Sequence, residues 1–199
     1  MSDSKILEDV AYLRKVVEDS RKVVVDNGVH LLGWGVLVVV GMILTYLSEH
    51  LKSNLPVFHI WVILIGLGWI FSIWDGWIKL NRARTRTFIQ KVLASLWLGL
   101  GVVMTIIGFL GPAAGAISTW AVVPLISLVL GAGLLTTGTI HHERVLIVAA
   151  VGWWIGGTIT LLFPGDYAIL LFAGMMIALQ IAPGIVVYRR WKREMGSAL

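Results

Sequence analysis

The sequence contains no cysteine and has few charged residues. None of its 199 residues is a cysteine, which excludes disulfide bonds, thiolate metal sites and cysteine nucleophiles. Charged residues make up 14% of the chain, whereas soluble domains contain about 25%. Hydrophobic residues make up 58% of the chain, and the mean hydropathy is +0.88. This composition excludes an ordinary water-soluble domain and predicts an integral membrane protein.

Long uncharged stretches locate the membrane spans. They lie between Asp26 and Glu49, Lys52 and Asp75, Lys91 and Glu143, Arg144 and Asp166, and Asp166 and Arg189. A helix needs about 20 apolar residues to cross the hydrocarbon core, so four stretches hold one helix each. The third stretch is long enough for two helices, because a Gly-Pro turn at 111–115 divides it. We therefore expect an all-α bundle of six transmembrane helices, near residues 29–47, 56–77, 91–110, 118–140, 145–163 and 167–188.

The basic residues predict the orientation. The chain has 16 Lys and Arg residues, and all except Lys52 lie before the first span, after the sixth, or in the loops after the second and fourth. Short basic loops stay in the cytoplasm, so six spans with both termini in the cytoplasm are expected. Residues 1–27 lack the apolar core of a cleavable signal peptide, so the first span is expected to act as the targeting signal. The net charge of +5 therefore requires no nucleic acid as a partner.

Residues 1–27 are predicted to form a cytoplasmic amphipathic helix ahead of the bundle (28–190), and residues 191–199 a basic cytoplasmic tail. Apolar side chains recur at alternating spacings of four and three, which places them on one helix face. This N-terminal seam consists of Ile6, Val10, Leu13, Val17 and Val24. The seam needs a packing partner: a second copy of the chain, a partner protein, the inner face of the bundle or the membrane interface.

Small residues predict where the spans pack closely. Gly33, Gly99 and Gly152 begin similar Gly-rich segments in the first, third and fifth spans, which suggests three hairpins that repeat in parallel about the membrane normal. The alternative is that these short similarities arise by chance. Further small residues recur every four positions on one face of the second and sixth spans, and close backbone approach is expected there. They are Gly68, Ser72 and Gly76, and Gly174, Ala178 and Ala182.

Four polar residues could line a path across the membrane. Gln180 precedes Pro183-Gly184, where a kinked helix could expose backbone groups to a substrate; the amide could equally bond a neighbouring helix. Thr136 and Thr137 could extend this path, although threonine hydroxyls also bond back to their own helix. Asp75 could couple to ions or protons, or pair with Lys79 as an anchor at the inner interface.

Neither a catalytic nor a metal-binding pattern is present. Paired carboxylates within a span, a G-x-S-x-G turn and a phosphate-binding loop are all absent from the sequence, so an enzyme is not expected and no cofactor is implied. His141-His142-Glu143 has the residue types of a metal site, but neighbours on a helix point about 100° apart. Of the ten Trp residues, most are expected at the two interfaces, Trp34, Trp61 and Trp97 among them. Trp69, Trp153 and Trp154 are expected to pack between helices.

The segment Leu7–Ser20, followed by Gly28 and Gly33-Trp34-Gly35, resembles a loose group of small uncharacterised bacterial membrane proteins. In these proteins a charged helix leads into a Gly-rich first span, and the similarity covers about the first 45 residues. It implies a bacterial inner membrane and no specific activity. We expect a non-enzymatic sensor, regulator or assembly subunit that binds a partner protein or a second copy through residues 3–27. The alternative is a small oligomeric transporter or channel with a polar path near Gln180 and Thr137.

Overall fold

The computed structural model describes residues 28–51, 56–82 and 88–196, without the side chains of 79–82 and 194–196. All secondary structure in this part of the chain is helical, and six of its helices are long and apolar enough to cross a membrane. The prediction of an all-α bundle with six spans is therefore confirmed. The N-terminal seam, the predicted helix 1–27 and the last residues of the predicted tail lie outside the described residues.

The six spans follow the predicted order closely. Four of them are single helices, namely α2 (Val29–His50), α3 (Val57–Arg82), α6 (Thr119–His141) and α7 (Arg144–Leu162). The third span joins α4 (Phe88–Thr105), the π-helical segment η1 (Ile106–Leu110) and α5 (Gly111–Ala113). The sixth joins α8 (Tyr167–Met175), the π-helical segment η2 (Met176–Ile181) and α9 (Ala182–Gly196). The predicted boundary between bundle and tail at residue 190 falls inside α9, so the helix continues into the first residues of the predicted tail.

Two glycines shape the ends of spans through left-handed backbone. Gly28 has φ +67° directly before α2, and Gly115 has φ +69° in the turn after α5. A side chain with a Cβ rarely adopts this conformation. The turn predicted at 111–115 is thus present, although the helix continues through Pro112 to Ala113 before it ends.

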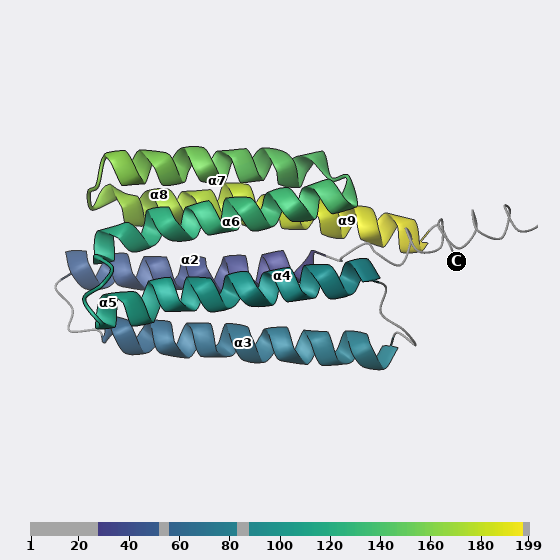
Figure 1. The fold of residues 1–199 in the computed structure, drawn as a ribbon, viewed down its shortest axis with the longest axis horizontal. Coiled ribbons are helices and arrows are strands. Elements are labelled where there is room, and N and C mark those ends of the chain that lie inside the picture. The colour runs from purple at the N-terminus through teal and green to yellow at the C-terminus, as the bar shows by residue number, and fades with distance from the viewer. Residues whose placement is uncertain (1–27, 52–55, 83–87, 197–199) are drawn as a thin grey trace, which may run out of the picture.

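The helices lie side by side along one common direction, with α3 at one edge of the bundle and α7 at the opposite edge (Figure 1). The most extensive contact joins α6 and α7. The buried core is centred on these two helices and the sixth span, and its largest fully buried side chains include Trp153, Phe172 and Leu134. The Trp153 and Phe172 rings meet edge to face with their centroids 5.3 Å apart.

The described helices do not support the predicted repeat of three parallel hairpins. Gly33 and Gly152 receive a side chain from a neighbouring helix, but a Cβ on Gly99 would meet no atom within 4 Å. The closest helix pair, α6 and α7, also joins two different predicted hairpins. The three glycines are therefore not equivalent, and their similar surroundings in sequence do not reflect a common packing site.

Candidate functional site

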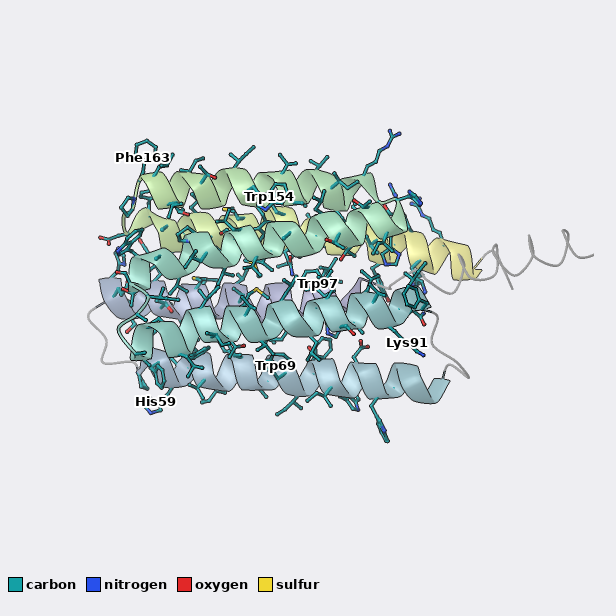
Figure 2. All side chains as sticks on the ribbon, viewed as in Figure 1. His59, Trp69, Lys91, Trp97, Trp154 and Phe163 are labelled. Carbon is teal, nitrogen blue, oxygen red and sulfur yellow. The ribbon has the colours of Figure 1, made fainter. Side chains whose placement is uncertain are left out.

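Tryptophan rings lie against glycines of neighbouring helices throughout the bundle. In four places the indole N–H also donates to a hydroxyl four residues after that glycine, and we call each such group an indole–hydroxyl unit. Their members are Trp34 with Gly68 and Ser72, Trp61 with Gly41 and Thr45, Trp69 with Gly101 and Thr105, and Trp97 with Gly133 and Thr137. Figure 2 shows Trp69 and Trp97 on successive helices of the bundle.

The geometry of the units follows from the missing glycine side chain. A Cβ on Gly68 would lie 2.5 Å from the Trp34 ring, and one on Gly41 would lie 2.8 Å from the Trp61 ring. The ring therefore occupies the place of a side chain, and its N–H reaches the next residue on the same helix face, one turn away. The indole nitrogens of Trp34, Trp61 and Trp97 lie 2.9, 3.0 and 3.0 Å from their hydroxyl oxygens.

These units add a second role to three tryptophans that the sequence predicts at the membrane interfaces. Trp34, Trp61 and Trp97 are half-buried between helices, where they pack and donate hydrogen bonds. The predicted packing of Trp69, Trp153 and Trp154 between helices holds, and Trp154 donates to the Leu128 carbonyl at 3.1 Å. The Gly-x-x-x-Ser/Thr spacing was readable in the sequence. The partner indole was not, because its helix and depth depend on the packing.

The threonines of the predicted polar path are engaged in hydrogen bonds. Thr137 is buried, accepts from Trp97 and donates to the Gly133 carbonyl at 2.8 Å. Thr136 is exposed on the outside of the bundle and donates to the Ala132 carbonyl at 3.0 Å. The two neighbours thus point in different directions, and the expectation that threonine hydroxyls bond back to their own helix applies to both.

Asp75 belongs to a polar network between α2 and α3. His30 Nδ1 lies 3.1 Å from Asp75 Oδ2, and His30 Nε2 lies 3.0 Å from Ser72 Oγ. Trp34 Nε1 donates to the same Ser72 Oγ at 2.9 Å. The His30 and Asp75 side chains are 31% and 16% exposed, so protons can reach the network although most of it is covered.

Sequence reasoning found Asp75 and Ser72 but missed His30. Ser72 was predicted only as a small packing residue, and Asp75 was predicted to couple ions or to pair with Lys79, whose side chain lies outside the described residues. A single histidine two residues after the start of a span carries no pattern of its own. Its role becomes visible only when α2 lies against α3.

Gln180 lies apart from this network, in the π-helical segment η2. The side chain is 3% exposed, and its Cγ would be 3.4 Å from a Cβ on Gly35 of α2. Its Oε1 has no hydrogen-bond partner among the described residues. The expected bond from the Gln180 amide to a neighbouring helix is therefore not made through its oxygen. The break in regular α-helix predicted near Pro183 is present as the π-helical segment that ends two residues earlier.

The small residues predicted to pack closely differ in how much they are buried. Gly68, Gly33 and Gly152 lie at close helix contacts, the last two against Phe71 and Leu179. Ser72 and Gly76 are half-buried. Gly174, Ala178 and Ala182 are exposed, and a Cβ on Gly174 or Gly99 would meet nothing within 4 Å.

The prediction for Gly99 and for the small residues of the sixth span is thus wrong, and the reason is steric. At the contact between α7 and the sixth span, the small residues come from α7 and the large ones from the sixth span. Leu179 lies over Gly152 and Met175 over Gly156. The bulky face of the sixth span therefore turns inward and its small face outward. In α4 the glycine that receives a ring is Gly101 rather than Gly99.

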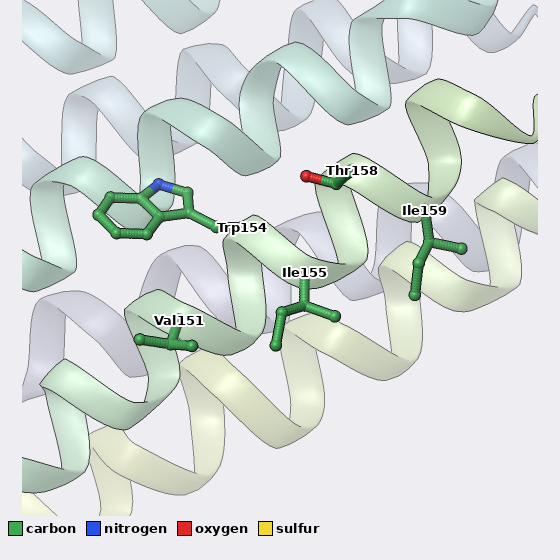
Figure 3. A pocket seen from close by; sticks show the side chains of 5 residues that line it. All are labelled: Val151, Trp154, Ile155, Thr158 and Ile159. Carbon is green, nitrogen blue, oxygen red and sulfur yellow. The ribbon is translucent and has the colours of Figure 1, made fainter.

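Two shallow hollows lie on the surface, and neither is lined by Gln180, Thr137 or Asp75. One lies at the turn between α6 and α7 and is lined by Thr139, His142, Arg144 and Ile147. The other is an apolar groove of about 410 Å³ along α7 (Figure 3), lined by Val151, Trp154, Ile155, Thr158 and Ile159. The side chains that line this groove are those of a lipid-facing surface. Neither hollow thus joins the four residues of the predicted polar path.

The described residues contain no group of three or more His, Asp and Glu side chains that could hold a metal ion. His141-His142-Glu143 is divided by the turn between α6 and α7, where His142 has φ 56°. Glu143 instead pairs with Arg190 of α9, with Oε2 and Nη1 2.6 Å apart.

Comparisons with family models, with curated protein sequences and with solved structures find no match to this chain. The polar network of His30, Ser72, Asp75 and Trp34 is a part-buried contact between the first two spans, and it contains a histidine.

Proposed function

We propose that this protein is a non-enzymatic sensor, regulator or assembly subunit of a bacterial inner membrane, with both termini in the cytoplasm. Residues 3–27 bind a partner protein or a second copy of the chain. The observation that carries this proposal is the position of the polar network. His30 lies in the first turn of α2, directly after the N-terminal segment, and bonds to α3. A change in the hydrogen bonds of His30 therefore alters the first turn of α2, which directly follows the N-terminal segment in the chain.

The hydrogen bonds between spans support a module that keeps its shape. Indole–hydroxyl units join α2 to α3, α3 to α4 and α4 to α6, and Trp154 joins α7 to α6. Lipid supplies no hydrophobic force between helices, so close packing and such bonds must hold the spans together. A bundle held in this way transmits a displacement of α2 to its neighbours.

The N-terminal seam provides the test. Changing Val10, Leu13 and Val17 to Asp should abolish chemical crosslinks to the partner or second copy in intact membranes, because buried charge opposes association. The matched control changes Ala11, Tyr12 and Lys15 to Asp, on the opposite face of the predicted helix, and should leave the crosslinks intact. Both variants should insert in equal amounts. Unchanged crosslinks in the seam variant would refute the proposal.

A transporter or channel is the second candidate, and the buried Oε1 of Gln180 favours it. An unpaired carbonyl oxygen inside a bundle is costly, and a polar substrate or water in transit would satisfy it. The absence of cysteine makes this testable, since an introduced cysteine is the only thiol. A membrane-impermeant thiol reagent should label exposed Ser118→Cys under either function. Labelling of Gln180→Cys would support transport, whereas protection equal to that of buried Leu134→Cys would exclude a hydrated path.

A further inference from the structure

One of the four indole–hydroxyl units differs from the other three. Thr45, Thr105 and Thr137 donate their hydroxyl hydrogens to the glycine carbonyl four residues earlier, at 2.9, 2.8 and 2.8 Å. Ser72 occupies the same position in its unit, but its Oγ lies 3.0 Å from His30 Nε2. The unit between Trp34 and Ser72 has thus acquired an ionisable group that the other three lack.

The donors and acceptors fix where the hydrogens lie when His30 is neutral. An indole N–H can only donate, and a carboxylate can only accept. Trp34 therefore donates to Ser72, and His30 Nδ1 carries the hydrogen that it donates to Asp75. His30 Nε2 is then an acceptor, so Ser72 donates its hydroxyl hydrogen to it. Every polar atom of this chain of three bonds has a partner.

The same geometry also accommodates a protonated His30. Both ring nitrogens then donate, one to Asp75 and the other to Ser72 Oγ, which can accept two hydrogen bonds. The Ser72 hydroxyl hydrogen must then turn away from His30, and a rotation of the Ser72 side chain toward the Gly68 carbonyl would give it the acceptor that the three threonines use. Protonation thus converts the contact with Asp75 into a charge-assisted hydrogen bond, which is the stronger kind.

We propose that His30, Ser72 and Asp75 form a proton-binding site that fastens the first turn of α2 to α3 when His30 is protonated. Histidine is the side chain that ordinarily changes charge between about pH 5 and 8. Because the proton strengthens the bond to Asp75, the fastened state is favoured at acidic pH and weakens as the pH rises. This deepens the proposed sensor function by naming its stimulus, and only the effect on a partner rests on that function.

The described side chains of the elements that pack on α2 contribute few further ionisable groups near this site. Of the described side chains, Asp75 is the charged group that α3 presents to His30. The segments α8 and η2, which also pack on α2, contribute Tyr167 at the far end of the bundle. From α9, the Tyr188 backbone lies beside Gly28, and four basic residues follow: Arg189, Arg190, Lys192 and Arg193. Arg190 is paired with Glu143.

The arrangement has the order of a Ser-His-Asp triad, but its geometry does not favour a nucleophile. Ser72 lies in the middle of α3, where the backbone N–H groups are used within the helix and cannot form an oxyanion hole. The Trp34 N–H also occupies Ser72 Oγ, the atom that would have to attack. In a hydrolase such a donor would stabilise the oxyanion of the intermediate, whereas the Trp34 N–H donates to the serine oxygen itself.

The first experiment tests the hydrogen positions. The full-length protein, with its five histidines ¹⁵N-labelled, is placed in lipid nanodiscs, and His30→Gln assigns the His30 signals. At high pH His30 should carry its hydrogen on Nδ1, and at low pH on both nitrogens. Asp75→Ala should remove the preference of the neutral ring for Nδ1, because it removes the acceptor of that hydrogen. Asp166→Asn, at the other end of the bundle, should not. A neutral His30 with its hydrogen on Nε2 would overturn the proposal.

The second experiment tests the fastening. The Leu32 amide donates to the Gly28 carbonyl at 3.1 Å in the first turn of α2 and reports its opening. Its hydrogen-exchange protection, corrected for the intrinsic pH dependence, should rise about tenfold from pH 8 to pH 5.5, the scale of a charge-assisted bond. The rise should vanish in His30→Gln and be absent at Ala121, in the first turn of α6. A rise that persists in His30→Gln would overturn the site.

Two further outcomes separate this inference from its alternatives. Covalent labelling of Ser72 by a fluorophosphonate probe that His30→Gln abolishes would identify a nucleophile and overturn the proposal. If the seam variant loses the partner crosslinks but the exchange protection of the Leu32 amide does not change with pH, the proposed function is sustained and the proton site is refuted. If the protection of the Leu32 amide rises at acidic pH as expected but the seam variant keeps its crosslinks, the proton site is sustained and the proposed function is refuted.

Discussion

The two sides of the bundle are packed in different ways. In the most apolar part of α3, 6% of the residues are buried, whereas the corresponding share of α6 is 44%. The backbones of α6 and α7 approach each other closely. At Gly157, for example, an added Cβ would lie 3.3 Å from the Pro124 carbonyl oxygen. The α3 helix instead meets α2 and α4 through indole rings laid on glycines.

The difference shows two uses of glycine in a membrane bundle. Between α6 and α7, Gly138 and Gly157 bring the two helices into direct contact, although the Trp154 ring lies over Gly131 there. The resulting core holds Trp153 and Phe172 with almost no exposure. Between α2, α3 and α4, glycine provides the place for an aromatic ring that keeps the helices apart and bonds to a hydroxyl. The second kind of contact buries less and leaves room for ionisable side chains such as His30. The proposed proton site lies on this less buried side.

A leucine at Gly138 should have the largest effect. A Cβ there would lie 3.0 Å from the Ile147 backbone nitrogen and 3.0 Å from Leu146 Cβ. Because the backbone cannot move aside, we expect Gly138→Leu to lower the free energy of unfolding by about 3 kcal/mol, the upper part of the range for overpacking. Denaturation in mixed detergent micelles measures this loss. Gly99→Leu in α4 is the control and should change the free energy of unfolding by less than about 0.5 kcal/mol. Equal losses in the two variants would refute the difference in packing between the two sides of the bundle.

The bond between Trp97 and Thr137 should have an intermediate effect. A double-mutant cycle with Trp97→Phe and Thr137→Val should give a coupling of about 0.6 to 1.7 kcal/mol, between the average and the largest value for side-chain hydrogen bonds between membrane helices. The matched cycle with Trp69→Phe and Thr105→Val should give less, because that pair is 3.4 Å apart rather than 3.0 Å and its bond is weaker. A larger coupling for the Trp69 pair would contradict the structure.

The ion pair between Arg190 and Glu143 should have the smallest effect. The Arg190 side chain is 56% exposed, so water and salt screen the attraction despite the short distance. We expect Arg190→Gln to change the free energy of unfolding by about 0.5 kcal/mol or less. Repeating the measurement in high salt should remove even this difference. A loss comparable to that of the Trp97 variant would show that the pair is a structural contact of the tightly packed side.

Local sequence predicted the number and order of the spans well and their contacts poorly. The spans follow from the length of uncharged runs, and the break in the sixth follows from Pro183. By contrast, Gly99 and Gly174 carry the same signal as Gly68, yet only Gly68 receives a ring. Ser72 and Asp75 were identified without His30, because the side chain that joins them comes from another helix. The site consists of residues from two helices, so the spacing of residues within one span could not reveal it.

What the sequence alone determined is therefore the set of spans, because crossing a membrane depends on length and charge within a single helix. Only the tertiary structure decided which face of each span turns inward. In a soluble protein the contrast between polar and apolar faces reveals that direction, but here nearly every face of a span is apolar. The direction is set by the fit of large side chains over small ones, as Leu179 over Gly152 and Trp34 over Gly68. That fit exists only between two helices, so neither helix encodes it by itself.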